Sequence, residues 1–220
     1  MNNQNVRFNR DDEIIPMLMT FKNISDEDGI ILVKMARNAV AEYVTNGNKI
    51  SETSFNDKFS FSAGVFVTIN DQSGLRGCIG YPLAVKKLSH ALIDAAISAA
   101  TDDPRFSSIT SDELEKLVFE VTLLSDTEEV SANSPDGIIS AIKIGRDGLI
   151  IEEGFQSGLL LPQVPIEYNW NVEEFLNHTC HKAGLRSGAW KHKTTKISKF
   201  QGVIFREVLP NGEIVQEKFQ

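Results

Sequence analysis

The hydrophobic residues of this chain follow two different periods, one typical of helices and one typical of strands. Between residues 26 and 46 they recur every three or four positions, after Ser25 and three consecutive acidic residues, and before Gly47. A serine cap followed by acidic residues favours the start of a helix. Between residues 63 and 69 every second residue is apolar, which predicts a strand with one buried face. The sequence therefore combines amphipathic helices with half-buried strands.

The remaining segments follow the same two patterns and are separated by residues that favour turns. We predict further helices over 85–101, 110–117 and 172–183, a brief helix that starts at Pro135, further strands over 75–80, 118–124, 142–144 and 149–151, and a last hairpin over 203–219. Asp147-Gly148 and Asn211-Gly212 are typical hairpin turns. Because the strands come as hairpins with helices between them, the predicted fold class is α+β with a mostly antiparallel sheet.

Composition and charge exclude several classes of protein. The 220 residues are 41% hydrophobic and 24% charged, and no apolar run approaches the roughly 20 residues that cross a bilayer. Residues 1–24 are polar, lack a secretory-signal pattern and are expected to form a leader with little structure, so the predicted location is cytoplasmic. The formal net charge of -8 disfavours nucleic acid as a partner. The basic segment 182–199 is either a solvated face or a local phosphate site.

The most informative stretch is LRGCIG at residues 75–80. In an extended strand its side chains alternate between two faces, with Leu75, Gly77 and Ile79 toward the core and Arg76, Cys78 and Gly80 away from it. A guanidinium beside a thiol favours the thiolate, so one interpretation makes Cys78 a nucleophile or a ligand contact in a cleft. In the other interpretation, Cys78 is a small buried hydrophobic residue, and the glycines allow close packing of neighbouring segments.

Two further segments carry candidate binding residues. Asp103 and Arg105 lie in a charged loop after a helix, where Arg105 either binds an anionic ligand or pairs with a neighbouring aspartate. Residues 158–167 run from leucines into two prolines, which stiffen the chain around Gln163 and Glu167. These two side chains either line a pocket or support the following helix.

No metal site is predicted. In the helix over 172–183, Cys180 falls on the apolar face, whereas His178 and His181 fall on the opposite side. Zinc would then need ligands from other segments. The two cysteines, 78 and 180, form no CxxC pair and no disulfide framework, so both are expected to be free thiols.

Five motifs together resemble the AMMECR domain family, which is named after a human chromosomal region. They are LRGCIG at 75–80, AATDDPRF at 99–106, IGRDGLII at 144–151, GLLLPQV at 158–164, and a tryptophan-to-leucine series at 170–185. The resemblance covers roughly residues 25–207 and implies one AMMECR domain with a larger and a smaller subdomain. The expected leader at 1–24 precedes it, and a C-terminal hairpin extension at 208–220 follows it. Pro165 stands where many relatives have alanine.

The resemblance suggests partner proteins but no biochemical activity. Prokaryotic members are linked with a Memo-type protein and a radical-SAM protein, whereas no biochemical activity is established for the family. The family's hexapeptide maps without change onto Leu75, Arg76, Gly77, Cys78, Ile79 and Gly80. The cofactor, if one exists, remains unknown.

Two functions follow from these residues. The first, which we prefer, is a binding module for a small ligand or a protein, with a cleft around the hexapeptide. Its candidate ligand-binding residues are Leu75, Gly77, Ile79, Gly80, Asp103, Arg105 and Gln163. The second is a cysteine-dependent enzyme or cofactor-handling component, with Cys78, Arg76 and Glu167 as its candidate catalytic residues. No histidine base is evident near Cys78, which weakens the enzyme hypothesis.

Overall fold

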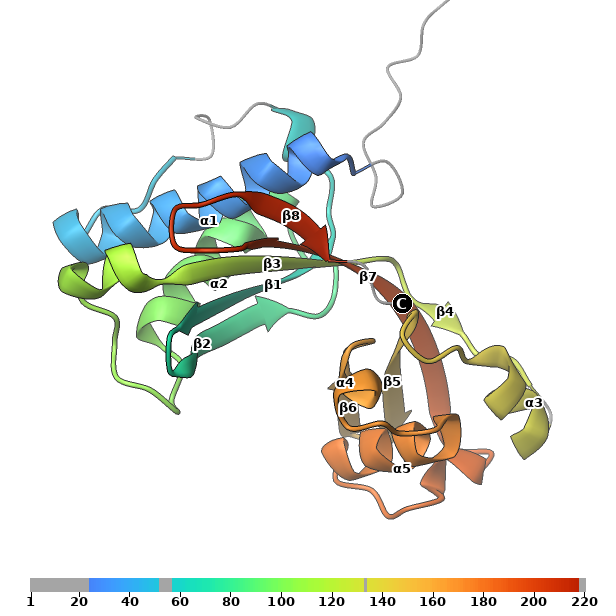
Figure 1. Ribbon diagram of the computed structural model, residues 1–220. Helices are drawn as coiled ribbons and strands as arrows, with labels where there is room; N and C mark the ends of the chain where they lie inside the picture. The colour runs from blue at the N-terminus through green and yellow to red at the C-terminus, as the bar shows by residue number, and fades with distance from the viewer. Residues whose placement is uncertain (1–23, 52–56, 133, 218–220) are drawn as a thin grey trace, which may run out of the picture.

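The computed structural model describes residues 24–51, 57–132 and 134–217 (Figure 1). Its elements, in chain order, are α1 (Asp26–Asn46), η3 (Asp57–Phe59), β1 (Gly64–Asp71), β2 (Gly74–Tyr81), α2 (Leu88–Thr101), η4 (Ser111–Lys116), β3 (Val118–Leu124), β4 (Glu128–Glu129), α3 (Pro135–Ala141), β5 (Asp147–Glu153), β6 (Gln156–Leu160), α4 (Val164–Glu167), α5 (Val172–Lys182), η5 (Ala189–Lys191), β7 (Lys196–Glu207) and β8 (Ile214–Glu217). The predicted leader, except for Ile24, lies outside the described residues, as do residues 218–220.

The strands form an antiparallel sheet in the order β2-β1-β3-β7-β5-β6, and both β4 and β8 pair with β7. Strand β7 belongs to two lobes, because residues 196–201 pair with β5 and residues 202–206 pair with β3. The larger lobe holds α1, α2, β1 to β3 and β8, and the smaller lobe holds α3 to α5 and β4 to β6 (Figure 1). The predicted α+β class, with a larger and a smaller subdomain, is confirmed.

Helix α1 begins and ends where the sequence predicts. The Ser25 hydroxyl accepts a hydrogen bond from the Asp28 N–H (3.3 Å), and the Asp28 carboxylate accepts one from the Ser25 N–H (3.0 Å). This capping box satisfies backbone donors that the first turn of a helix leaves without partners. Gly47 ends the helix with a φ of 72°, in the left-handed region that glycine adopts without strain.

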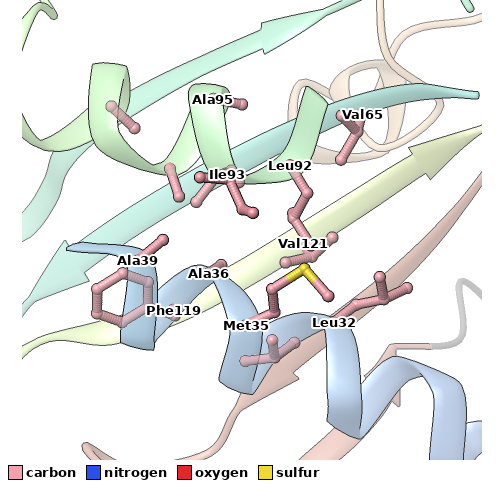
Figure 2. Close-up of a cluster of buried hydrophobic side chains, with 14 of the residues drawn as sticks. Leu32, Met35, Ala36, Ala39, Val65, Leu92, Ile93, Ala95, Phe119 and Val121 are labelled. Atoms are coloured by element: carbon pink, nitrogen blue, oxygen red, sulfur yellow. The ribbon is translucent and has the colours of Figure 1, made fainter. Parts of the chain in front are cut away.

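The core of the larger lobe lies between one face of the sheet and helices α1 and α2 (Figure 2). Val65, Val67 and Ile69 of β1 are fully buried there, as the alternating pattern predicts. They pack with apolar residues from both helices and from β3, among them Leu32, Met35, Ala36, Ala39, Leu92, Ile93, Ala95, Phe119 and Val121. The intervening side chains of β1 and β3 therefore point to the other face of the sheet.

The core of the smaller lobe is formed by α5 against β5 and β6. Phe175, Leu176 and Cys180 are fully buried in it, which confirms the predicted apolar face of this helix. A third apolar group joins the two lobes, where Leu124, Ile150 and Phe200 are packed by Phe66, Leu159 and Leu161. Side chains from both lobes thus meet on the face of the sheet that α1 and α2 leave uncovered.

Two predicted elements begin three or more residues away from their predicted starts. Helix α2 begins at Leu88 rather than at residue 85, and Val85 is 66% exposed. Strand β7 begins at Lys196 rather than at residue 203, and its first half buries Ile197 and Phe200. These two residues are three positions apart and belong to cores on opposite faces of the strand, so no two-residue alternation marks this half in the sequence.

The strand predicted over 142–144 is absent from this described segment. Helix α3 ends at Ala141, and a turn follows instead. The buried carboxylate of Asp147 accepts the backbone N–H of Lys143 (2.8 Å) and pairs with Arg146 (2.6 Å). A carboxylate that satisfies the backbone locally replaces the strand partner that was expected here.

Candidate functional site

Four side chains form a row across the face of the sheet that is turned away from α1 and α2. Cys78 of β2 lies opposite Thr68 of β1, Thr68 lies opposite Glu120 of β3, and Glu120 lies opposite Arg206 of β7. Directly opposite residues of neighbouring antiparallel strands point to the same side. The row therefore leads from the LRGCIG strand toward the shared strand β7.

Cys78 is partly buried, and its surroundings favour the neutral thiol. The Thr68 hydroxyl donates a hydrogen bond to the Cys78 sulfur (3.3 Å). Burial is the largest cause and raises the pKa of Cys78. The Thr68 hydrogen bond and the charge of Arg105 lower this pKa without offsetting burial, and the Glu120 and Asp103 carboxylates raise it by smaller amounts. The arginine whose charge favours the thiolate is therefore Arg105, whereas the sequence pointed to Arg76.

Asp103 connects the loop after α2 to the LRGCIG strand. Its carboxylate accepts the backbone N–H of Cys78 (2.9 Å), and it accepts the backbone N–H, Nε and Nη2 of Arg105 (3.1, 2.9 and 2.6 Å). The Asp103 side chain is only 2% exposed, and the Arg105 guanidinium holds the pKa of this carboxyl well below its usual range. About half of the Arg105 side chain remains exposed beside Cys78.

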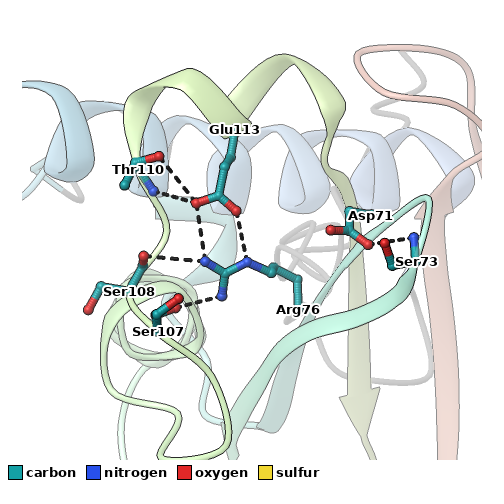
Figure 3. A network of polar contacts seen from close by, with 7 residues as sticks. All are labelled: Asp71, Ser73, Arg76, Ser107, Ser108, Thr110 and Glu113. Carbon is teal, nitrogen blue, oxygen red and sulfur yellow. Dashed lines mark hydrogen bonds and ion pairs between the residues drawn. The ribbon is translucent and has the colours of Figure 1, made fainter.

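Arg76 belongs to a separate network (Figure 3). Its guanidinium donates two hydrogen bonds to Glu113, at 2.8 and 3.1 Å, and others to the carbonyls of Ser107 (2.6 Å) and Ser108 (3.3 Å). The Arg76 side chain is 12% exposed, and its charge lowers the pKa of Glu113. These contacts attach β2 to η4 and to the loop before it, which is a structural role for Arg76.

A polar pocket of about 250 Å³ lies where the two lobes face each other. We call it the inter-lobe pocket, and its lining residues are Glu120 from β3, Gln163 and Glu167 at α4, Ile204 and Arg206 from β7, and Glu217 from β8. Burial, together with Glu217, raises the pKa of Glu120 to about 7, and Arg206 partly opposes this rise. A partly buried carboxyl that titrates near neutrality can both accept and release a proton at physiological pH.

The structure brings only some of the candidate residues together. Cys78, Asp103 and Arg105 form one group, and Gln163 and Glu167 line the inter-lobe pocket. The row through Thr68 and Glu120 lies between these two groups. Arg76 shares the strand face of Cys78, two residues away, but its hydrogen bonds go to Glu113 and to the Ser107 carbonyl.

Four pocket residues were not predicted from the sequence, namely Glu120, Ile204, Arg206 and Glu217. Glu120 does leave a signal there, because it interrupts the apolar run of the strand predicted over 118–124. No comparable signal marks Arg206 and Glu217, whose contribution depends on how β8 pairs with β7.

The other residues of the hexapeptide serve packing in different ways. A Cβ at Gly77 would lie 2.0 Å from the carbonyl oxygen of Ala99 in α2, so glycine allows the helix to lie directly on the strand. A Cβ at Gly80 would lie 2.3 Å from the carbonyl oxygen of Val65. Ile79 packs against the core of the larger lobe, whereas Leu75, which was expected to face the core, is 39% exposed.

The histidines of α5 take part in a surface stack of rings. Trp170 lies between Tyr168 and His178, with ring centroids 4.9 and 3.8 Å away, and His181 meets His178 edge to face. Within the described ranges, no group of three or more histidine, cysteine, aspartate or glutamate side chains is arranged to hold a metal ion. No helix in the described part of the chain is long and apolar enough to span a bilayer.

Comparisons with known proteins identify the family. The AMMECR1 family model matches residues 33–205. The chain is 46% identical over 194 residues to a protein of Methanocaldococcus jannaschii, covering 87% of this chain and 96% of that protein, and 46% identical over 208 residues to one of Thermofilum pendens, covering 88% and 96%. The crystal structure of an uncharacterized protein from Pyrococcus horikoshii is 44% identical and superimposes with a TM-score of 0.83, covering 89% of this chain and 98% of that one. The chain therefore belongs to the AMMECR1 family.

Proposed function

We propose that this protein is a binding module that takes a small ligand in the inter-lobe pocket, whose β3 wall lies two strands away from the LRGCIG strand. The observation that carries the proposal is the composition of the pocket walls. Glu120 and Arg206 come from the larger lobe's side of the sheet, and Gln163 and Glu167 come from the smaller lobe. A polar pocket with walls from two lobes is a common place for ligands, because contacts with both walls orient the bound molecule.

The surroundings of Cys78 favour binding over cysteine chemistry. A nucleophilic cysteine needs a lowered pKa or an adjacent base, and burial raises the pKa of this thiol. The cysteine-dependent alternative, in which the protein works with Memo-type and radical-SAM proteins, would need Arg105 to offset that burial. A cytoplasmic location suits either function, since both free cysteines persist in a reducing compartment.

Protein NMR with a fragment library tests the proposal. Anionic, cationic and neutral fragments are added to uniformly labelled protein, and amide shifts are followed across both lobes. We expect the shifts to concentrate around Glu120, Gln163 and Arg206, with saturable affinities. Shifts that scatter over the surface, or none that saturate, would contradict a binding module at this place.

Two glutamine variants provide the matched comparison. Gln163→Ala removes an amide from the pocket wall, and we expect it to weaken the bound fragments at least fivefold. Gln201→Ala removes an exposed amide from β7, outside the pocket, and should leave the affinities unchanged. Equal effects of the two substitutions would show that the pocket is not where the fragments bind.

A further inference from the structure

The charges that line the inter-lobe pocket are unbalanced. Three carboxyl groups enter it from different elements, Glu120 from β3, Glu167 from α4 and Glu217 from β8, against one guanidinium, Arg206. Arg206 Nε lies 3.4 Å from Glu217, and both side chains are partly exposed. Among the described residues, no lysine or arginine forms an ion pair with Glu120 or Glu167. The pocket lining thus holds more carboxyl groups than cationic groups.

Glu120 shows the consequence of this imbalance. The charged groups around Glu120 are Glu217 and Arg206 on the neighbouring strands and Glu167 in α4. The Thr122 hydroxyl lies on its own strand and lowers the pKa of Glu120. Glu120 in turn raises the pKa of Cys78 in β2. Burial and the neighbouring carboxylates disfavour its ionised form, so its pKa rises to about 7. A cation in the pocket would reverse this effect and release the proton.

Gln163 contributes an acceptor from the opposite wall. Its Oε1 atom is buried and has no hydrogen-bond partner among the described residues. Buried carbonyl oxygens of this kind are normally paired, and an unpaired one marks a place where a donor belongs. An ammonium group carries three donors and no acceptor, so it matches a site built from carboxylates and an amide carbonyl.

The size and polarity of the pocket limit the ligand further. About 250 Å³ is less than the space that a drug-sized ligand fills. The lining that a ligand can reach is mainly polar, because Ile204 is only 2% exposed. The fit is therefore to a single cationic head group, whose short aliphatic stem points out of the pocket.

We propose that the inter-lobe pocket recognises a primary ammonium group on an aliphatic stem, held by Glu120 and Glu167 and by the carbonyl oxygen of Gln163. This inference rests on the proposed function and gives its ligand class. The same chemistry is offered by a free alkylamine and by a lysine side chain of a partner protein. The two sources are distinguished by the test.

Isothermal titration calorimetry with small probes tests the proposal on the full chain. The probes are butylammonium, the methylamide of N-acetyl-lysine, and butyrate and butanol as charge controls, each at pH 7 in phosphate and in MOPS buffer. We expect saturable binding of the two amines only, with a buffer-dependent heat that reports proton release. A lysine derivative that binds at least tenfold tighter than butylammonium indicates a protein partner, and the reverse order indicates a free amine.

Two variants complete the test. Glu120→Gln keeps the shape of the side chain and should weaken amine binding at least tenfold while abolishing proton release. Glu129→Gln removes the same charge from an exposed position on β4 and should change neither. The inference is overturned if butyrate or butanol binds as tightly as the amines, if no amine saturates, or if the two variants behave alike. Anionic or neutral fragments that occupy the pocket in the NMR screen would leave the binding module standing and remove only its amine preference.

Discussion

The backbone N–H of Cys78 donates a hydrogen bond to the buried carboxylate of Asp103, 2.9 Å away. The same carboxylate binds Arg105 through its main chain and its side chain. One residue of the DDPRF segment therefore orients two other groups, the backbone of the LRGCIG strand and an arginine whose charge lowers the pKa of the Cys78 thiol. This contact explains why the two motifs, although far apart in the sequence, form one structural unit.

We predict that Asp103→Asn lowers the free energy of unfolding by about 2 kcal/mol, because hydrogen bonds that involve charged groups contribute about 1.5–3 kcal/mol each. Urea denaturation measures the change. Asp102→Asn, at the exposed neighbouring position, is the control and should have little effect. Equal stabilities of the two variants would contradict the assigned role.

The same carboxyl should make the protein sensitive to acid. The pKa of Asp103 is lower in the folded protein than in the unfolded chain, so its stabilising effect is complete above the unfolded pKa of about 4 and is lost as the pH falls toward the folded value. Below pH 4, wild-type protein should therefore lose more stability than Asp103→Asn. If the free energies of unfolding of the two proteins fell in parallel below pH 4, the low pKa assigned to Asp103 would be contradicted.

Arg76 should prove structural rather than catalytic. Arg76→Ala removes both the two-pronged contact with Glu113 and the positive charge, so we expect a loss of about 2 kcal/mol in stability. The pH dependence of Cys78 alkylation should stay as in the wild type, whereas Arg105→Ala should shift it upward. Iodoacetamide kinetics read out by mass spectrometry separate Cys78 from Cys180. An upward shift in Arg76→Ala as large as that in Arg105→Ala would restore the thiol-activating role.

The close approach of α2 to β2 depends on Gly77. An added Cβ would overlap the carbonyl of Ala99 at 2.0 Å, so Gly77→Ala should destabilise the protein by about 3 kcal/mol. Gly202→Ala is a suitable control, because the nearest atom to a Cβ there lies 3.6 Å away, and its cost should stay within about 0.5 kcal/mol. Thermal unfolding compares the two.

Local patterns predicted much of the fold from the sequence. The alternation of Val65, Val67 and Ile69 identified the buried face of β1, and the spacing around Cys180 identified the buried face of α5. Both features depend only on the period of a helix or a strand. The capping box at Ser25 is equally local, since its two partners are three residues apart.

The candidate site was predicted less well, because it depends on contacts between distant segments. Arg76 and Glu113 are 37 residues apart in the sequence, and no local pattern indicates that they pair. Glu120 meets Arg206 only because β3 and β7 are neighbours, and that pairing follows from the sheet order. Gln163 and Glu167 were found because their proline-rich segment is unusual in itself.

Glu120 should give the protein a distinct pH dependence near neutrality. Its pKa is about 7 in the folded protein and about 4.3 in the unfolded chain, so the folded state retains a proton that the unfolded chain releases between these values. Stability should therefore fall as the pH rises through this window. Glu120→Gln should remove that loss and be more stable than the wild type at pH 8 by about 2 kcal/mol, whereas Glu129→Gln should follow the wild-type curve. Urea denaturation of the three proteins at several pH values measures these free energies of unfolding.

The most direct test asks whether the pocket binds its ligand without the cysteine. The affinity of the tightest pocket-binding fragment is measured by calorimetry for the wild type and for Cys78→Ser, which keeps a small hydrogen-bonding side chain. A binding module centred on Glu120 and Gln163 predicts affinities within twofold of each other. A tenfold or greater loss in Cys78→Ser, with Gln163→Ala unaffected, would contradict that account and return the function to the cysteine.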